Sequence, residues 1–194
     1  RRSKDNASMA PLAALVIMIA SCVSLVRVLV LIGAVSPMLF GALTPPLWAM
    51  LAWCILISAS LFFFAKEREG GMAEQHNPAD FKSAFVFGAL YAVILLAVAA
   101  AKDHFGSRGL YFVGVISGLT DVDAITLSTS KLAGGERVEQ ATAWRTILIA
   151  VMSNFVFKFG AVALLSSRRL TAYVGAVFAL ALAGGGLLLW LWPG

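Results

Sequence analysis

The arrangement of this chain depends on ISGLTDVDAITLSTSKL, residues 116–132. It places two carboxylates, Asp121 and Asp123, directly after the apolar run GLYFVGV at residues 109–115. Hydroxyl side chains follow the acids, and such a run is too polar for a helix end that faces lipid. Two interpretations remain open: a helix that lines a hydrated vestibule, or an ordinary amphipathic helix end that stops at Gly134-Gly135.

The rest of the chain is suited to a membrane. Of its 194 residues, 60% are hydrophobic and 13% charged, with a mean hydropathy of +0.89, whereas soluble domains have about 45–50% apolar and about 25% charged residues. Crossing a hydrocarbon core of about 30 Å takes about 20 helical residues. Apolar runs of that order lie at 11–32, 47–64, 81–101, 143–165 and 171–192, and 109–132 is a sixth, atypical one. The sequence predicts an all-α integral membrane protein, one domain over 1–194, with about six transmembrane helices.

The distribution of basic residues predicts an orientation. The net charge of +5 does not indicate nucleic-acid binding, because the Lys and Arg residues are spread around the ends of the expected spans. With six crossings, the side of the N-terminus collects most of them, including Arg1, Lys66 and Arg137. Because Lys and Arg gather on the cytoplasmic side, we expect both termini in the cytoplasm. Cys22 and Cys54 lie inside expected spans, where they serve as small apolar residues.

The chain also matches itself at an offset of 96 residues, where SCVSLVRVLVL at 21–31 aligns with SGLTDVDAITL at 117–127. Identical pairs include Ser21 with Ser117 and Trp48 with Trp144. The match predicts two three-helix repeats, about 10–101 and about 109–193. Because each repeat has an odd number of spans, the second would be inverted in the membrane, as in many transporters. The alternative is a chance match between two apolar segments.

Four ionisable residues fall within the expected spans: Arg27, Asp121, Asp123 and Lys158. Their formal charges sum to zero, and a charge at the centre of a membrane helix costs about 2.5–3.5 kcal/mol on insertion scales. They should therefore face inward and pair, and the repeat alignment sets Arg27 opposite Asp123. For Lys158 the alternative is that the side chain snorkels to the nearer interface.

The two acids could bind one ligand only if the helix is broken. On an unbroken helix Asp121 and Asp123 point about 200° apart, and we expect a break near Ser117-Gly118 that lets Thr120, Asp121 and Asp123 converge. Carboxylates with nearby hydroxyls suit a hard cation such as Mg²⁺, and we take Asp121 and Asp123 as the candidate metal ligands. A proton relay or a structural salt-bridge network fits the same residues. Asn154 and Lys158 share a helix face directed at this segment.

No motif in the chain indicates an enzyme. His76 and His104 have no metal-ligand spacing to a Cys or Asp, and no Ser/His/Asp arrangement, P-loop or dinucleotide fingerprint occurs. A membrane-embedded, metal-dependent transferase that uses the Asp-x-Asp pair would lack a phosphate-binding motif. We therefore expect a non-enzymatic protein without a certain cofactor, in which Mg²⁺ would be a substrate or ligand.

Several of these pieces resemble one family. They are Asn77-Pro78, the residues around 105–111, SGLTDVDAITLS at 117–128, the Asn154-x-x-x-Lys158 pair, and Ser24 with Arg27 in the first span. The chain is similar in these pieces to the uncharacterised bacterial and archaeal membrane domain that often follows an MgtC/SapB domain in one polypeptide. The resemblance implies a cytoplasmic (inner) membrane location, a link to Mg²⁺ homeostasis and an MgtC/SapB-type partner domain. Either the membrane domain occurs alone here or an upstream MgtC/SapB half was left out, and the Arg1 start agrees with the second alternative.

These observations favour a membrane transporter or channel for a cation, with Mg²⁺ as the first candidate. In this hypothesis Asp121, Asp123, Thr120, Ser117 and Asn154 form the ion site or pathway, and Arg27 and Lys158 are counter-charges. The alternative is a non-transporting membrane regulator or assembly module in which the four charges form a fixed network. The lipid bilayer is the expected surrounding, and the small residues at Gly184-Gly185-Gly186 favour close helix packing or a homodimer.

Overall fold

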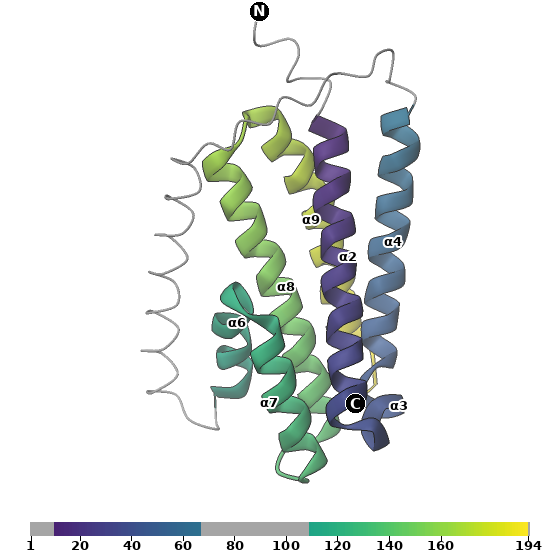
Figure 1. Cartoon of the computed structure of the whole chain (residues 1–194), viewed down its shortest axis with the longest axis vertical. Helices are drawn as coiled ribbons and strands as arrows, with labels where there is room; N and C mark the ends of the chain where they lie inside the picture. Colours follow the sequence, from purple (N-terminus) through teal and green to yellow (C-terminus); the bar gives the residue numbers. More distant parts are fainter. Residues whose placement is uncertain (1–9, 67–108, 194) are drawn as a thin grey trace, which may run out of the picture.

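The computed structural model describes residues 10–66 and 109–193, and within them every regular element is helical (Figure 1). The elements are α2 (Ala10–Val35), η1 (Pro37–Leu39), α3 (Phe40–Leu43), α4 (Pro45–Lys66), α6 (Leu110–Thr120), α7 (Val122–Gly134), α8 (Gln140–Leu165) and α9 (Arg168–Leu191). The all-α prediction is confirmed for this part of the chain. The span predicted at 81–101 lies outside the described residues.

Four of these helices are long and apolar enough to cross a membrane: α2, α4, α8 and α9. The 26 residues of α2 and of α8 extend about 39 Å, more than a hydrocarbon core of about 30 Å. The chain is therefore suited to membrane embedding, as its composition predicts. The expected runs at 11–32 and 143–165 agree with α2 and α8 to within a few residues.

The residues of α2 show why this helix suits a membrane. Met18, Leu25 and Ile32 recur every seven residues and are buried against the other helices. Val16 and Val23 have the same spacing on the outer face and are exposed. A helix that is apolar on its packed face and on its outer face suits lipid, because in water its outer face would carry polar residues.

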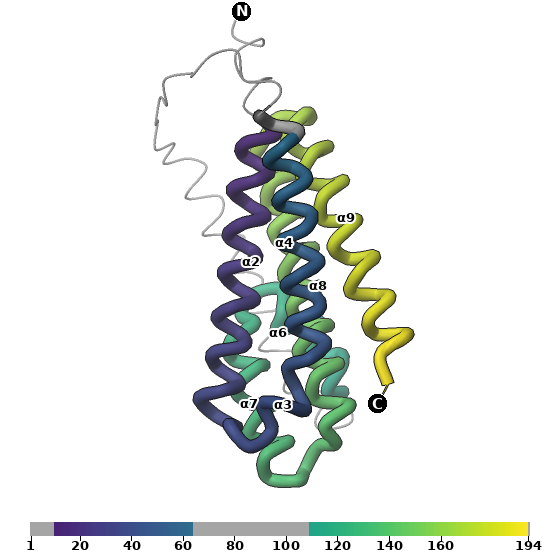
Figure 2. Tube along the Cα trace, turned by 90° about the vertical axis from the view of Figure 1, so that its right-hand side faces the viewer, coloured from purple at the N-terminus to yellow at the C-terminus, as the bar shows by residue number. Residues whose placement is uncertain are grey.

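The long helices alternate in direction. Figures 1 and 2 show α2 and α9 running from the upper to the lower end of the bundle, and α4 and α8 running back. The contacts agree for α8 and α9. Arg145 near the start of α8 reaches the carbonyl of Trp192 after the end of α9, and farther along the rings of Phe155 and Phe178 stack at 5.3 Å.

Helices α6 and α7 are too short to cross. Their 11 and 13 residues extend about 16 and about 20 Å. Along α6, Gly114 packs on Thr146 and Gly118 on Ala150, so α6 runs parallel to α8. Its direction is therefore opposite to that of α2.

Helix α7 runs the other way. Asp123 at its start contacts Arg27, and Ser130 near its end contacts Ser36, so α7 is parallel to α2. Because α6 is antiparallel to α2, the pair α6–α7 forms a re-entrant hairpin that enters and leaves the bundle at the same end (Figure 1). Its tip is Asp121, which is extended (φ −147°, ψ 104°) between the two helices.

The hairpin corrects two predictions about the segment 109–132. The segment is not a sixth crossing, because the chain reverses at Asp121. The break lies at Asp121 rather than near Ser117-Gly118, and Gly118 stays inside α6. The glycine is needed there for another reason: a Cβ at Gly118 would overlap the backbone of Ala150.

The described helices also differ from the predicted inverted repeat. At the offset of 96 residues, α2 aligns with the α6–α7 segment and α4 with α8. An inverted repeat requires aligned elements to run in opposite directions, but α7 is parallel to α2, and α4 is parallel to α8 (Figures 1 and 2). The start of α2 and the end of α9 lie at opposite ends of the bundle (Figure 2). The six-span inverted repeat is therefore not confirmed by the described residues.

Candidate functional site

The candidate site begins with the backbone at the tip of the hairpin. The Asp121 N–H donates to the Ser117 carbonyl at 2.7 Å, which closes the last turn of α6. The Asp121 carboxylate accepts the N–H of Asp123 at 2.8 Å and so caps the N-terminus of α7. Aspartate is among the best N-cap residues, because its oxygen accepts an otherwise unpaired helix donor and its charge suits the helix dipole.

The tip is held in place by α8. The Ser153 hydroxyl donates to the Val115 carbonyl at 2.6 Å, and the Asn154 amide donates to the Gly118 carbonyl at 3.3 Å. Gly114 and Gly118 lie four residues apart on the face of α6 that packs on α8. Small residues at this spacing let membrane helices approach closely. The hairpin is therefore docked by close backbone contact and two side-chain hydrogen bonds.

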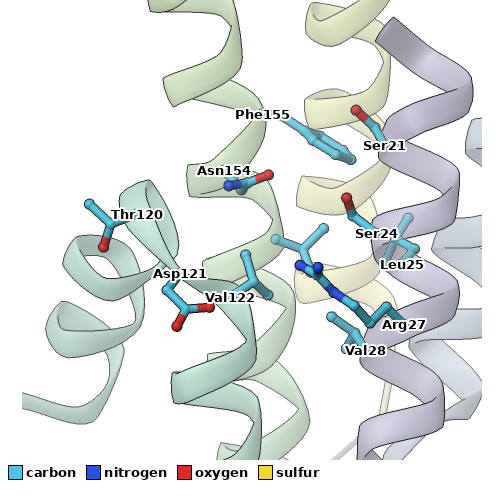
Figure 3. Close-up of a pocket in the computed structure, with 11 residues that line it drawn as sticks. Ser21, Ser24, Leu25, Arg27, Val28, Thr120, Asp121, Val122, Asn154 and Phe155 are labelled. Carbon is cyan, nitrogen blue, oxygen red and sulfur yellow. The ribbon is translucent and has the colours of Figure 1, made fainter. Parts of the chain in front are cut away.

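A cavity of about 60 Å³ lies between the tip, α2 and α8 (Figure 3). Since one water needs about 10–15 Å³ of cavity volume, the cavity has room for a few waters or a small ion with part of its hydration shell. The lining residues are Ser21, Ser24, Leu25, Arg27 and Val28 of α2, Thr120, Asp121 and Val122 of the hairpin, and Val151, Asn154 and Phe155 of α8.

Arg27 and Asp123 form an ion pair beside this cavity, with 3.0 Å between Nε and Oδ1. The predicted pairing of Arg27 with one of the two acids is confirmed. Apart from this ion pair, Asp123 Oδ1 has no hydrogen-bond partner among the described residues, so this oxygen depends on Arg27. The carboxylate of Asp123 is thus turned toward α2, and Asp123 does not line the cavity.

Lys158 does not pair with an acid in the described structure. Its ammonium donates to the hydroxyls of Ser21 at 3.2 Å and Ser24 at 3.5 Å. These hydroxyls donate their own protons to the carbonyls of Ile17 and Ala20, which leaves their lone pairs to accept from the ammonium. The side chain therefore points into the bundle, as one of the two alternatives predicted, but its partners are hydroxyls.

The structure brings some of the predicted site residues together and separates others. Thr120, Asp121, Asn154 and Arg27 line the cavity, whereas Asp123 and Lys158 contact residues that line it. Ser117 does not line the cavity, and its carbonyl accepts the hydroxyl of Thr120 at 3.2 Å. In the described part of the chain no group of three or more His, Cys, Asp or Glu side chains could hold a metal ion. Asp121 is thus the acid that faces the cavity.

Sequence reasoning missed Ser21 and Ser24 as site residues. Both face the cavity, and Ser21 is fully buried. The signal was available: Ser21, Ser24 and Arg27 recur every three residues, and side chains three apart share a helix face. The two hydroxyls therefore mark the same face of α2 as the intramembrane arginine.

Comparisons with known proteins place this chain in a family without an assigned function. The chain is 34% identical over 125 residues to an uncharacterised protein of Aquifex aeolicus (strain VF5), a match that covers 62% of this chain and 54% of the relative. The chain thus spans about half the length of that curated relative. No solved structure matches. Residues 1–166 match the family described as a domain of unknown function, DUF4010, and the chain belongs to this family.

Proposed function

We propose that this chain is a membrane transport domain for a small cation, with Mg²⁺ as the first candidate, and that Asp121 is its principal ligand. One observation carries the proposal: an exposed carboxylate stands at the tip of a re-entrant hairpin and lines a cavity between the hairpin, α2 and α8. Among the described residues no basic side chain forms an ion pair with Asp121, whereas Asp123 is paired with Arg27. A carboxylate in this position is free to bind a cation.

The re-entrant hairpin itself supports a transport role. Helix ends inside a membrane expose backbone groups that lipid cannot satisfy, and such breaks are tolerated where they are packed in protein or line a water-filled cavity. Here the last turn of α6 and the first turn of α7 meet at the cavity. Transporters commonly use broken helices of this kind near the membrane midplane to coordinate substrates and ions.

The oxygen atoms around the cavity suit a hard cation. Mg²⁺ binds through one or two carboxylates and keeps several waters. The Asp121 carboxylate would supply the charge. Because the amide nitrogen of Asn154 donates to Gly118, its oxygen is left for a ligand, and Figure 3 shows this oxygen on the side of Ser21 and Ser24. The two serine hydroxyls would complete the set through water.

Lys158 gives this proposal a mechanism. Its ammonium occupies Ser21 and Ser24, the same hydroxyl oxygens that a cation in the cavity would use. A cation that enters must displace or repel the ammonium. Because the Lys158 hydrogen bonds join α8 to α2, the contact between these helices would differ between the occupied and the empty site. Such a differential interaction is what a ligand needs to shift a conformational equilibrium.

We further propose five crossings and one hairpin, from the four described spans together with the span predicted at 81–101. Helix α9 begins with Arg168 and Arg169 at the same end of the bundle as the start of α2, and Arg1, Arg2 and Lys4 precede α2 in sequence. Because Lys and Arg favour the cytoplasm, this end would face the cytoplasm of a bacterial or archaeal inner membrane. We also propose that an MgtC/SapB-type domain is the partner of this chain.

A non-transporting regulator is the second candidate, and one observation favours it. The Arg27–Asp123 pair and the Lys158 hydrogen bonds are complete without any ion. In this reading the charges hold the bundle together, and other chains dock on its outer faces. The glycines at 184 and 185 are not available for a dimer contact, however, because Trp53 and Met152 of the same chain pack on them.

Flux measurements separate the two candidates. The full chain is reconstituted in liposomes that hold an indicator for the cation under test, and uptake of Mg²⁺, Ca²⁺, Na⁺ and protons is compared with that of protein-free liposomes. Transport predicts uptake of at least one cation above the protein-free rate. Correctly folded protein with no uptake of any of the four would favour the regulator.

A further inference from the structure

A second cavity lies away from the hairpin, between α4 and α9. This groove has a volume of about 310 Å³, and Ala49 and Trp53 of α4 face Gly184, Leu187 and Leu191 of α9 across it. Its lining is almost wholly apolar. The groove lies toward the end of the bundle where α9 stops, and Trp192 and Pro193 complete it there.

Trp53 closes the deep end of the groove. Its indole lies directly against Gly184, where a Cβ would overlap the ring. The indole N–H donates to the Leu180 carbonyl at 3.0 Å. Since this bond uses the single donor of the indole, the ring presents only carbon surface to the groove.

A guanidinium stands at the other end. Arg145 lies 4.8 Å over the ring of Trp144 and donates to the carbonyl of Trp192 at 3.5 Å. A guanidinium has five N–H donors, and within the described residues Arg145 forms no ion pair. Arg145 does not itself line the groove, but it contacts Trp192, which does, so a positive charge with spare donors adjoins the mouth of the groove.

The depth of these residues matches that of a lipid. Arg145 is the sixth residue of α8, and Trp192 directly follows α9, so both lie near one end of the bundle, where Trp and Arg meet lipid headgroups. From Leu191 to Gly184 the groove follows α9 for seven residues, about 10 Å toward the membrane centre. A phosphate at the mouth and an acyl chain in the groove fit this geometry.

We infer that the groove between α4 and α9 binds one anionic phospholipid, with the phosphate on Arg145 and an acyl chain along Trp53 and Leu187. Guanidinium groups bind phosphate through paired hydrogen bonds, and basic pockets between membrane helices hold anionic headgroups. Charge at the mouth and carbon surface inside select this occupant over a helix from a second chain. The inference does not depend on transport at Asp121.

Native mass spectrometry of the full chain tests the inference. Phosphatidylglycerol and phosphatidylcholine with the same acyl chains are titrated onto delipidated wild-type protein. The wild type should bind one phosphatidylglycerol about fivefold more tightly than phosphatidylcholine, as expected for one basic residue near a headgroup. Arg145→Gln should remove this preference, whereas Arg137→Gln, an exposed arginine in a nearby loop, should keep it. Ala49→Phe should reduce the binding of both lipids by filling the groove.

Three results would overturn the inference. Equal affinity of the wild type for the two lipids would remove the role of the charge. An unchanged preference in Arg145→Gln would place the phosphate elsewhere. A change from dimer to monomer in Ala49→Phe, with lipid binding retained, would identify the occupant as a second copy of the chain. If Ala49→Phe fails to fold, the two arginine variants still decide the question.

Discussion

The hydroxyl of Ser36 donates to the carbonyl of Ser130 at 2.9 Å, across 94 positions of sequence. Ser36 directly follows α2, and Ser130 lies in the last turns of α7. This bond brings the ends of both helices to one end of the bundle. If residues 109–132 crossed the membrane as a sixth span, the two serines would lie on opposite sides of the membrane and could not form this hydrogen bond. The bond therefore supports the re-entrant hairpin.

Labelling of introduced cysteines checks this topology. Met38 is 98% exposed in the turn after α2, and Arg137 is exposed in the turn after α7. With Cys22 and Cys54 replaced by alanine, we expect a membrane-impermeant maleimide to label Met38→Cys and Arg137→Cys from the same side of sealed vesicles. Ser166→Cys, in the turn between α8 and α9, should be labelled from the other side. Labelling of Met38→Cys and Arg137→Cys from opposite sides would restore the sixth crossing.

The packing of the hairpin on α8 gives a second prediction. A Cβ at Gly118 would overlap the Ala150 backbone, within 2.6 Å of its Cα, whereas a Cβ at Gly160 of α8 has no neighbour within 4 Å. Gly118→Ala should lower the free energy of unfolding by about 1–3 kcal/mol, as overpacked sites do. Gly160→Ala should change it by no more than about 0.5 kcal/mol. Unfolding in mixed detergent micelles measures both.

Equal stability of the two glycine variants would contradict the close approach of α6 to α8. Reduced stability of both to the same degree would point to a general sensitivity of the bundle to added methyl groups. Either result would leave the hairpin without the docking contact that holds Asp121 at the cavity.

The apolar spans could be predicted from sequence because length and composition determine them. The hairpin could not be predicted in this way. Residues 110–134 are together long enough to cross a membrane, and as far as Gly118 they are as apolar as a crossing helix. The local signal was Asp121 followed by Asp123, which is the pattern of an N-cap with an acid in the first helical turn. The same two acids also fit a ligand pair, whereas in the structure Asp121 caps the N-terminus of α7.

The candidate site was predictable in part for the same reason. Charge balance requires a partner for an intramembrane arginine, and Arg27 does pair with Asp123. The partners of Lys158 could not be predicted from charge, because they are the hydroxyls of Ser21 and Ser24. Serine occurs in many membrane helices without such a role, so only the arrangement in space identifies these two.

The ion pair between Arg27 and Asp123 should be energetically coupled. We expect a double-mutant cycle with Arg27→Gln and Asp123→Asn to give a coupling energy of about 0.5–3 kcal/mol in the free energy of unfolding, the range for contacting residues. A matched cycle with Arg169→Gln and Asp123→Asn should give no coupling, because Arg169 is exposed at the other end of the bundle. Additive effects in the first cycle would mean that the pair does not form in the membrane.

Lys158 should oppose cation binding. Lys158→Met keeps the length of the side chain and removes the ammonium that occupies Ser21 and Ser24. Because hydrogen bonds to charged groups contribute about 1.5–3 kcal/mol, the Mg²⁺ concentration for half-maximal uptake should fall about tenfold or more. Lys131→Met, at an exposed position of α7, serves as the control. If Lys158→Met left the Mg²⁺ concentration for half-maximal uptake unchanged, the Lys158 ammonium would not compete with the cation for Ser21 and Ser24.

Mg²⁺ uptake by liposomes that contain Asp121→Asn tests whether Asp121 is the cation ligand. Asparagine caps a helix about as well as aspartate, so this variant removes the charge at the tip and keeps the hairpin. Glu139→Gln, which removes an exposed carboxylate before α8, is the matched control. If Asp121 is the ligand, Asp121→Asn should fold and lose Mg²⁺ uptake, while Glu139→Gln should keep the wild-type rate. Wild-type uptake by folded Asp121→Asn would contradict this role of Asp121.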